Sequence, residues 1–243
     1  MLYQPRFYRH KFLPKNLEKC CIAIKETDLC IYATRILERE AQKAIQTCRS
    51  VIETYISLHP EFKTSMEPLP VSCSAHQLIQ DMILAGIQAH VGPMAAVAGA
   101  IAEYVANDLM TYDIQEIIVE NGGDIFIHVN RPLTIGIYAG ESPLSFKIGV
   151  EYKNFNHPYA VCTSSGTVGH SYSYGKADAV CVIARSGALA DASATAIGNR
   201  VQTKQDIESA VQFGKTIQGV CAILIIKNKE MGLWGDIEVV KIK

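Results

Sequence analysis

The chain has 243 residues, of which 49% are hydrophobic and 19% are charged, and its formal net charge is −1. This composition is typical of a globular protein that buries one large core or two modest ones, and it excludes a disordered chain. A near-neutral charge without runs of like charges provides no electrostatic basis for binding nucleic acid or an anionic membrane, so we expect neither as a partner.

The N-terminal segment, MLYQPRFYRHKFLPKNLEKC, carries charges throughout and lacks the apolar stretch of a signal peptide. The eight cysteines form no C-x-x-C pair, and several lie inside apolar runs such as DAVCVIA. This spacing is not that of a metal site, and reduced cysteine in such runs behaves as a small hydrophobic residue. We therefore expect a cytoplasmic protein with reduced, mostly structural thiols.

The first half of the chain predicts two strands followed by two helices. CCIAIKETDLCIYAT indicates a hairpin that turns at ETD, and RILEREAQKAIQTCRSVIETYISLHP has apolar residues at helical spacing. A proline-rich loop is expected over residues 60–75. The second helix is expected from His76 to about Leu109, with a break at Gly92 and Pro93.

Part of this second helical segment, residues 82–102, has no formal charge over a length that could span a bilayer. However, Gln88, His90 and the Gly92–Pro93 break fall in its middle, where polar groups are costly in lipid. We therefore expect a buried helix rich in small residues.

The second half predicts strands, two helices and a closing strand pair. IQEIIVENGGDIFIHVN indicates two strands joined at Gly-Gly, PLTIGIYAG and SFKIGVEYK indicate further strands, and ALADASATAIGNRV and TKQDIESAVQFGK indicate helices. The order lacks the alternation of a doubly wound fold and favours an α+β fold, with helices layered on one face of antiparallel sheets. We expect one compact unit of two related halves, residues 1–111 and 112–243.

The first candidate site is the segment LADASATAIGN, which places Asp191 and Thr195 four residues apart on one face of a predicted helix. A carboxylate and a hydroxyl are hard oxygen donors that suit Mg²⁺. The alternative is purely structural, because an acidic residue early in a helix is favoured by the helix dipole and threonine can bond to its own helix.

The second candidate is the turn in VENGGDIF. Gly122 and Gly123 permit positive φ and let a ligand approach the backbone closely, and Asn121 and Asp124 flank them. The alternative is an ordinary polar hairpin corner.

The third candidate is the polar segment CTSSGTVGHSYSYGKADAV. Its successive small residues could present backbone N–H groups and hydroxyls to a phosphate, and they are Thr163, Ser164, Ser165, Gly166 and Thr167. His170 could move a proton near neutral pH, and Lys176 could neutralise an anion. A mobile surface loop is the alternative, although long loops without secondary structure are uncommon in compact domains unless they are functional.

Two cysteines adjoin these segments. Cys162 opens the polar segment, and Cys73 lies in the proline-rich loop near His76. A thiolate at either position could act as a nucleophile or carry a persulfide, whereas an isolated cysteine is more often inert.

Taken in order, these segments resemble the superfamily of FAD:protein FMN transferases, the ApbE-like proteins. ETDL, VGPMAAVAGAIAE, VENGGD, SSGTVGHSYSYGKADAV and ADASATAIGN are similar to signatures of an archaeal and bacterial branch of it, and together they cover most of the chain. The resemblance implies a T-fold-like α+β architecture, and such proteins often form homo-oligomers.

The resemblance also implies roles for individual residues. Asp191 and Thr195 match positions that hold Mg²⁺ in the transferases, and the segment 122–124 matches the turn that lines their flavin nucleotide cleft. His170 falls near the histidine that precedes their Asp-Pro-x-Thr-Gly motif. This chain has SYSYGKAD in place of that motif and no Lys-Gly in VAGAIAEYVAND.

Three functions follow as hypotheses. The first is a Mg²⁺-assisted transferase that acts on a phosphorylated or nucleotide ligand, with FAD or FMN as candidate cofactors. The second, from the context of the family, is a cysteine-based sulfur carrier in sulfur assimilation and homocysteine formation. The third is a ligand-binding oligomeric module without catalysis.

Overall fold

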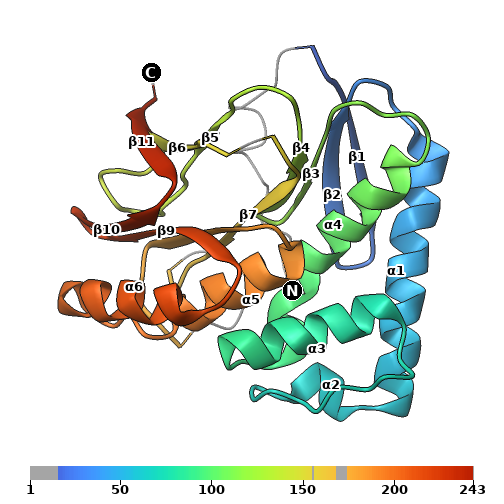
Figure 1. Cartoon of the computed structure of the whole chain (residues 1–243), viewed down its shortest axis with the longest axis horizontal. Helices are drawn as coiled ribbons and strands as arrows, with labels where there is room; N and C mark the ends of the chain where they lie inside the picture. The colour runs from blue at the N-terminus through green and yellow to red at the C-terminus, as the bar shows by residue number, and fades with distance from the viewer. Residues whose placement is uncertain (1–15, 155, 168–173, 243) are drawn as a thin grey trace.

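The computed structural model describes residues 16–154, 156–167 and 174–242 (Figure 1). Its elements in chain order are β1 (Glu18–Ile24), β2 (Thr27–Ala33), α1 (Glu38–Leu58), α2 (Glu61–Thr64), α3 (Gln77–Ala89), η2 (Pro93–Ala96), α4 (Val97–Met110), β3 (Ile117–Asn121), β4 (Asp124–His128), β5 (Thr134–Gly136), β6 (Ile148–Tyr152), β7 (Tyr159–Ser164), β8 (Ala179–Ala184), α5 (Gly187–Gly198), η3 (Lys204–Asp206), α6 (Ile207–Thr216), β9 (Val220–Lys227), β10 (Glu230–Gly235) and β11 (Ile237–Lys241).

The molecule has three layers. The central layer is an antiparallel sheet with the strand order β1-β2-β3-β4-β7-β8-β9-β10. The helices cover one face of this sheet, and a three-stranded sheet, β11-β6-β5, covers the other (Figure 1). Along β2, β3, β4, β7, β8 and β9, alternate residues enter one or the other of the two hydrophobic cores, as the period of two in a strand requires. The predicted α+β fold, with helices on one face of an antiparallel sheet, is confirmed.

Helix α5 is buried along almost its whole length, and its sequence is GALADASATAIG. A helix that is apolar on all sides belongs inside a protein. Its glycine and alanine residues let α3, α4 and strands β7 and β8 approach it closely. This close packing brings the polar residues of α5 next to segments that are distant in the sequence.

Three local expectations differ from the structure. The loop expected over residues 60–75 contains the short helix α2. Thr163 and Ser164, expected in a loop, are the last residues of β7. The closing segment divides at Gly235, whose φ of +96° lets the chain leave the central sheet as β10 and enter the small sheet as β11.

The predicted break between α3 and α4 is present. α3 ends at Ala89, His90 follows in the left-handed conformation, and Pro93 begins η2. Within the described part of the chain, no single helix has the length and apolar character to cross a bilayer. α3 and the η2–α4 segment meet those criteria only as a pair, bent by 105°.

A disulfide joins Cys21 of β1 to Cys30 of β2, which face each other in the strand register with their Cα atoms 4.2 Å apart. The expectation of reduced cysteines is therefore wrong at this pair, because the hairpin register brings the two sulfur atoms together. The other six cysteines are free. A cytoplasmic location and a division into related halves at residue 112 stay predictions, although β3 and β4 lie beside β2 in the sheet.

Candidate functional site

The carboxylate of Asp191, on α5, lies at the N-terminus of α4. Its Oδ2 atom accepts hydrogen bonds from the backbone N–H groups of Ala98, at 3.0 Å, and Gly99, at 2.9 Å. Such amides in the first turn of a helix have no partner within that helix, and the positive end of the helix dipole favours an anion beside them. A side chain that is only 9% exposed is thereby held at one orientation.

A reciprocal contact joins the same two helices, with the carboxylate on α4 and the hydrogen-bond donors at the start of α5. Glu103, on α4, accepts hydrogen bonds from the Gly187 N–H, at 2.7 Å, and from the Ser186 hydroxyl, at 3.3 Å, at the start of α5. The segments involved are GAIAE, which begins at Gly99, and GALAD, which begins at Gly187. Glu103 is not among the residues predicted from the sequence, and the similarity of these two pentapeptides is the signal that could have identified it.

The Gly-Gly turn between β3 and β4 is linked both to β7 and to α4. Asp124 accepts a hydrogen bond from the Thr163 N–H at 3.1 Å, and the Thr163 hydroxyl donates to the Gly123 carbonyl at 3.0 Å. The Asn121 side-chain amide donates to the Ala98 carbonyl at 3.1 Å. The predicted turn and the end of β7 therefore meet at the N-terminus of α4, where Asp191 also lies.

Glycine is required at position 123 for two reasons. Its φ is +107°, which strains any residue with a side chain, and a Cβ there would lie 2.8 Å from the Thr163 hydroxyl oxygen. The Gly123 N–H donates to the buried carboxylate of Glu120 at 2.8 Å. The adjacent Gly122 is exposed, so solvent reaches the backbone of this turn.

Asp124 and Asp191 form what we call the carboxylate pair. Burial, and then the charge of Asp191, raise the pKa of Asp124 well above its usual value, although hydrogen bonds from Thr163 and Cys162 oppose this. Burial raises the pKa of Asp191 to about 7, against the lowering effect of the Gly99 and Ala98 N–H groups. Because Asp191 accepts two amides at a helix N-terminus, we assign the first ionisation of the pair, as the pH rises through about 7, to Asp191 and the retained proton to Asp124.

Thr195 lies one turn beyond Asp191 on α5 and is partly buried. Its hydroxyl forms no hydrogen bond with a described residue, and its role as a metal ligand stays a prediction. Among the described residues, no group of three His, Cys, Asp or Glu side chains has an arrangement suited to a metal ion. A cation here would therefore depend on the pair, a hydroxyl and ligand or water oxygens.

Cys162 is fully buried beside the carboxylate pair, and its thiol donates to the Gly187 carbonyl at 3.7 Å. Burial and the charges of Asp124 and Asp191 raise the pKa of Cys162 well above its usual value. The thiolate that a nucleophile or persulfide carrier needs is disfavoured in this environment.

The remaining hydroxyl-bearing residues lie toward the other end of α5. Ser164 lies near Gly198, the last residue of that helix and about 10 Å along its axis from Asp191. Beyond it, the Ser165 hydroxyl accepts from the Thr167 N–H at 3.1 Å, and the Gly166 N–H donates to the Ala177 carbonyl at 2.9 Å. These groups bond within their own segment.

Lys176 is exposed in the same region, with its N–H donating to the Val201 carbonyl at 2.7 Å. His170 lies outside the described residues. The structure therefore unites the Gly-Gly turn, Thr163 and Asp191 at one end of α5, and places the Ser-Gly segment and Lys176 toward the other.

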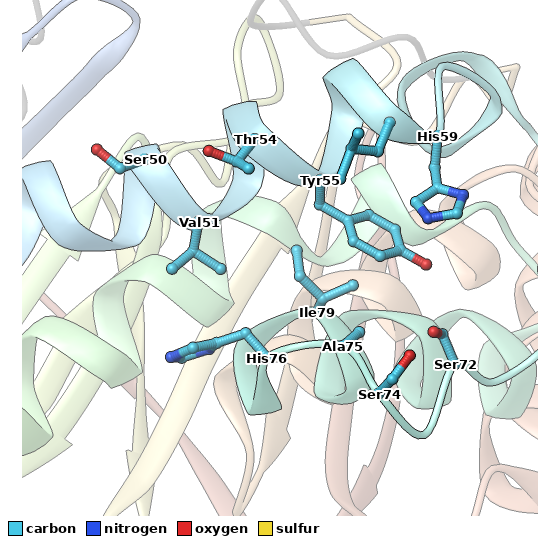
Figure 2. A pocket seen from close by; sticks show the side chains of 11 residues that line it. Ser50, Val51, Thr54, Tyr55, His59, Ser72, Ser74, Ala75, His76 and Ile79 are labelled. Atoms are coloured by element: carbon cyan, nitrogen blue, oxygen red, sulfur yellow. The ribbon is translucent and has the colours of Figure 1, made fainter.

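A separate groove of about 470 Å³ lies between the C-terminal half of α1 and the loop that precedes α3 (Figure 2). It is lined by Ser50, Val51, Thr54, Tyr55, Leu58, His59, Ser72, Ser74, Ala75, His76 and Ile79. His76 Nδ1 accepts the Leu78 N–H at 3.2 Å and so caps α3, while Cys73 on the same loop is exposed. None of the residues predicted to bind metal or phosphate lines this groove.

Comparison with known proteins places the chain in a family. A family model described as "AbpE bacteria" matches residues 10–232. The UPF0280 protein of Archaeoglobus fulgidus is 44% identical over 204 residues, which cover 82% of this chain and 83% of the relative. The UPF0280 protein of Methanocaldococcus jannaschii is 40% identical over 227 residues, which cover 90% and 92%.

Solved structures agree at the level of the fold. The flavin transferase ApbE from Vibrio cholerae has a TM-score of 0.59 at 15% identity, and the match covers 90% of this chain and 97% of that one. The flavinyl transferase ApbE of Pseudomonas stutzeri has a TM-score of 0.57 at 12% identity and covers 90% and 94%. The chain therefore belongs to the UPF0280 family, a branch of the ApbE-like superfamily.

Proposed function

We propose that this protein binds a phosphorylated or nucleotide ligand together with Mg²⁺ beside the carboxylate pair, and that it transfers a group from that ligand. The observation that carries the proposal is the burial of Asp124 and Asp191 together, with the pKa of both raised. Two adjacent buried carboxylates cost stability unless a cation or a proton neutralises them.

The donor set fits Mg²⁺. Asp124 and Asp191 supply carboxylate oxygens and Thr195 supplies a hydroxyl, and Mg²⁺ in proteins commonly takes one or two carboxylates with waters and phosphate oxygens. When bound, Mg²⁺ would act as a Lewis acid that stabilises charge on a phosphate group. Its binding would displace the proton held on Asp124, because a metal ligand must be deprotonated.

The residues of the chain would orient the ligand. The exposed backbone of Gly122 lets a phosphate approach the turn without a side chain in the way. The Ala98 and Gly99 amides hold Asp191 in place before any ligand arrives, so the site is preorganised. FAD and FMN are the first ligands to test, because solved proteins with this fold are named flavin transferases.

Isothermal titration with FAD, FMN and ATP, each with and without Mg²⁺, tests the proposal. We expect Mg²⁺-dependent binding of one of them, loss of that binding in Asp191→Asn, and no change in Asp108→Asn. Asp108 is an exposed carboxylate on α4 and serves as the matched control.

Two outcomes count against the proposal. Absence of binding by all three ligands contradicts it, as does equal binding by wild type and Asp191→Asn. Chromatography of the bound nucleotide over time then separates transfer from binding alone: a ligand that binds and stays unchanged indicates the non-catalytic module.

A further inference from the structure

Strand β10 forms one edge of the central sheet and carries two exposed apolar side chains. Met231 is 47% exposed and Leu233 is 48% exposed, and the alternation of a strand places both on the same face. Among the described residues, β10 pairs only with β9. Edge strands of soluble proteins are usually protected by charge, so an apolar edge indicates a surface that is covered by a partner.

The strand at the opposite edge, β1, provides a comparison. Its exposed residues include Glu18 and Lys19, and Cys21 is held in the disulfide to β2. Charged side chains at an edge disfavour pairing with another strand. The one charged residue of β10, Glu230, is the first residue of the strand and lies 3.8 Å from Lys204, so β10 is the edge that favours pairing.

The register of the β9–β10 hairpin shows which backbone groups of β10 are free. Lys227 and Glu230 close a two-residue turn and face each other, so this pair exchanges hydrogen bonds. Along β10, every second residue, starting with Glu230, directs its backbone N–H and C=O groups toward β9. Met231 and Leu233 consequently direct their N–H and C=O groups away from the sheet, at the open edge.

The other face of β10 is already occupied. A Cβ at Gly232 would lie 2.4 Å from the Ile207 side chain of α6, and Trp234 packs against the helical core. The helix-facing side of β10 is thus covered by α6 and the helical core. The edge and the side bearing Met231 and Leu233 remain for a partner.

We propose that β10 pairs antiparallel with β10 of a second copy of the chain, about a two-fold axis through Gly232. In this register Met231 faces Leu233 of the second copy and Leu233 faces Met231 of the second copy. Both pairs use the backbone groups that point outward, so each exchanges hydrogen bonds. The two Gly232 residues meet on the axis, where strands approach most closely and no side chain intervenes.

The charges that flank the strand suit this register. Lys229 precedes β10 and Asp236 follows it, both are exposed, and neither forms an ion pair with a described residue. Antiparallel pairing brings the Lys229 end of one copy beside the Asp236 end of the other, and the two-fold axis repeats this contact. Opposite charges at strand ends favour that orientation over a parallel one.

Neighbouring registers are less favourable. A shift by one residue sets the side chains of the two copies on opposite faces of the joined sheet. A shift by two residues in one direction pairs Leu233 with Lys229 of the second copy. A shift by two residues in the other direction pairs Leu233 with Leu233 of the second copy and brings Glu230 opposite Asp236. Only the register about Gly232 pairs both exposed apolar residues with each other.

Sedimentation velocity over a range of protein concentrations tests the proposal. We expect a concentration-dependent dimer for wild type and a monomer at every concentration for Met231→Lys and Leu233→Lys. Leu58→Lys, at a residue on α1 that is 72% exposed, is the matched control and should dimerise like wild type. Circular dichroism establishes that each variant is folded.

Disulfide trapping tests the register. In a Cys73→Ser background, the double variant Met231→Cys/Leu233→Cys should form a covalent dimer on mild oxidation, because its new thiols face each other. Each single cysteine variant should trap far less, since its thiol then faces Leu233 or Met231. A monomeric wild type, or lysine variants that still dimerise, overturns the proposal, and equal trapping by the single variants overturns the register.

Discussion

Gly99 and Gly187 lie in direct backbone contact where α4 crosses α5. A Cβ at Gly99 would lie 2.1 Å from the Gly187 carbonyl oxygen, and a Cβ at Gly187 would lie 2.3 Å from the Gly99 carbonyl oxygen. This contact brings Asp191 to the first turn of α4 and Glu103 to the first turn of α5. The geometry of the carboxylate pair therefore depends on two residues that bind no ligand themselves.

Gly187→Ala should separate the two helices and lower the free energy of unfolding by about 1–3 kcal/mol, the range for overpacking a tight core. Urea denaturation measures this change. Gly198→Ala, at the other end of α5, is the control. A Cβ there meets its nearest atom at 3.5 Å, so we expect no loss, or a gain of roughly 0.5–1 kcal/mol. Equal effects of the two substitutions would contradict this explanation.

Asp191→Asn should change how stability depends on pH. Burial raises the pKa of Asp191 from 3.8 to about 7, so the folded state retains a proton that the unfolded chain loses. The free energy of unfolding therefore falls as the pH rises from about 4 to about 7, by roughly 4 kcal/mol at most. The neutral variant lacks this loss, and in metal-free buffer at pH 8 we expect it to be the more stable protein.

Mg²⁺ provides the matching comparison for this substitution. A cation that binds the ionised pair stabilises only the folded wild type, so its melting temperature at pH 8 should rise with Mg²⁺ concentration while that of Asp191→Asn stays constant. A variant that is less stable than wild type at pH 8 without metal would mean that the two amides of α4 outweigh the cost of burying the charge.

Glu103→Ala should lower the free energy of unfolding by about 0.5–2 kcal/mol, because the Gly187 N–H and the Ser186 hydroxyl lose their acceptor at the start of α5. Glu103→Gln keeps an oxygen acceptor. Burial raises the pKa of Glu103, so ionisation of its side chain as the pH rises lowers the free energy of unfolding, and the uncharged glutamine variant should match or exceed wild type at pH 8. Thermal unfolding of both variants checks this, and a glutamine variant as unstable as the alanine one would disprove the capping role.

Native thiol labelling should separate the cysteines by exposure. Cys73 is exposed and should react with iodoacetamide within the native state, whereas Cys162 is fully buried with a raised pKa and should react only after unfolding. Mass spectrometry of digested protein identifies the modified residue. Early modification of Cys162 would restore it as a candidate nucleophile.

Most of the helices and strands, and the class of the fold, could be predicted from the amino-acid sequence alone. Helical periodicity predicted α1 and α6, alternating and β-branched runs predicted the strands, and the Gly-Gly segment predicted the β3–β4 turn. These features depend on residues close together in the chain, whose preferences can be read locally. The four-residue spacing of Asp191 and Thr195 is likewise a property of one helix.

Which of these segments come into contact could not be predicted in this way, because it depends on how the helices pack on the sheet. The hydrogen bond from Gly99 to Asp191 joins residues 92 apart, and the bond from Gly187 to Glu103 joins residues 84 apart. The disulfide at Cys21, the deep burial of Cys162 and the distance of the Ser-Gly segment from Asp191 arise from the same packing. No local preference encodes such contacts, because they depend on how α4 and α5 cross over the sheet and on the small residues that allow that crossing.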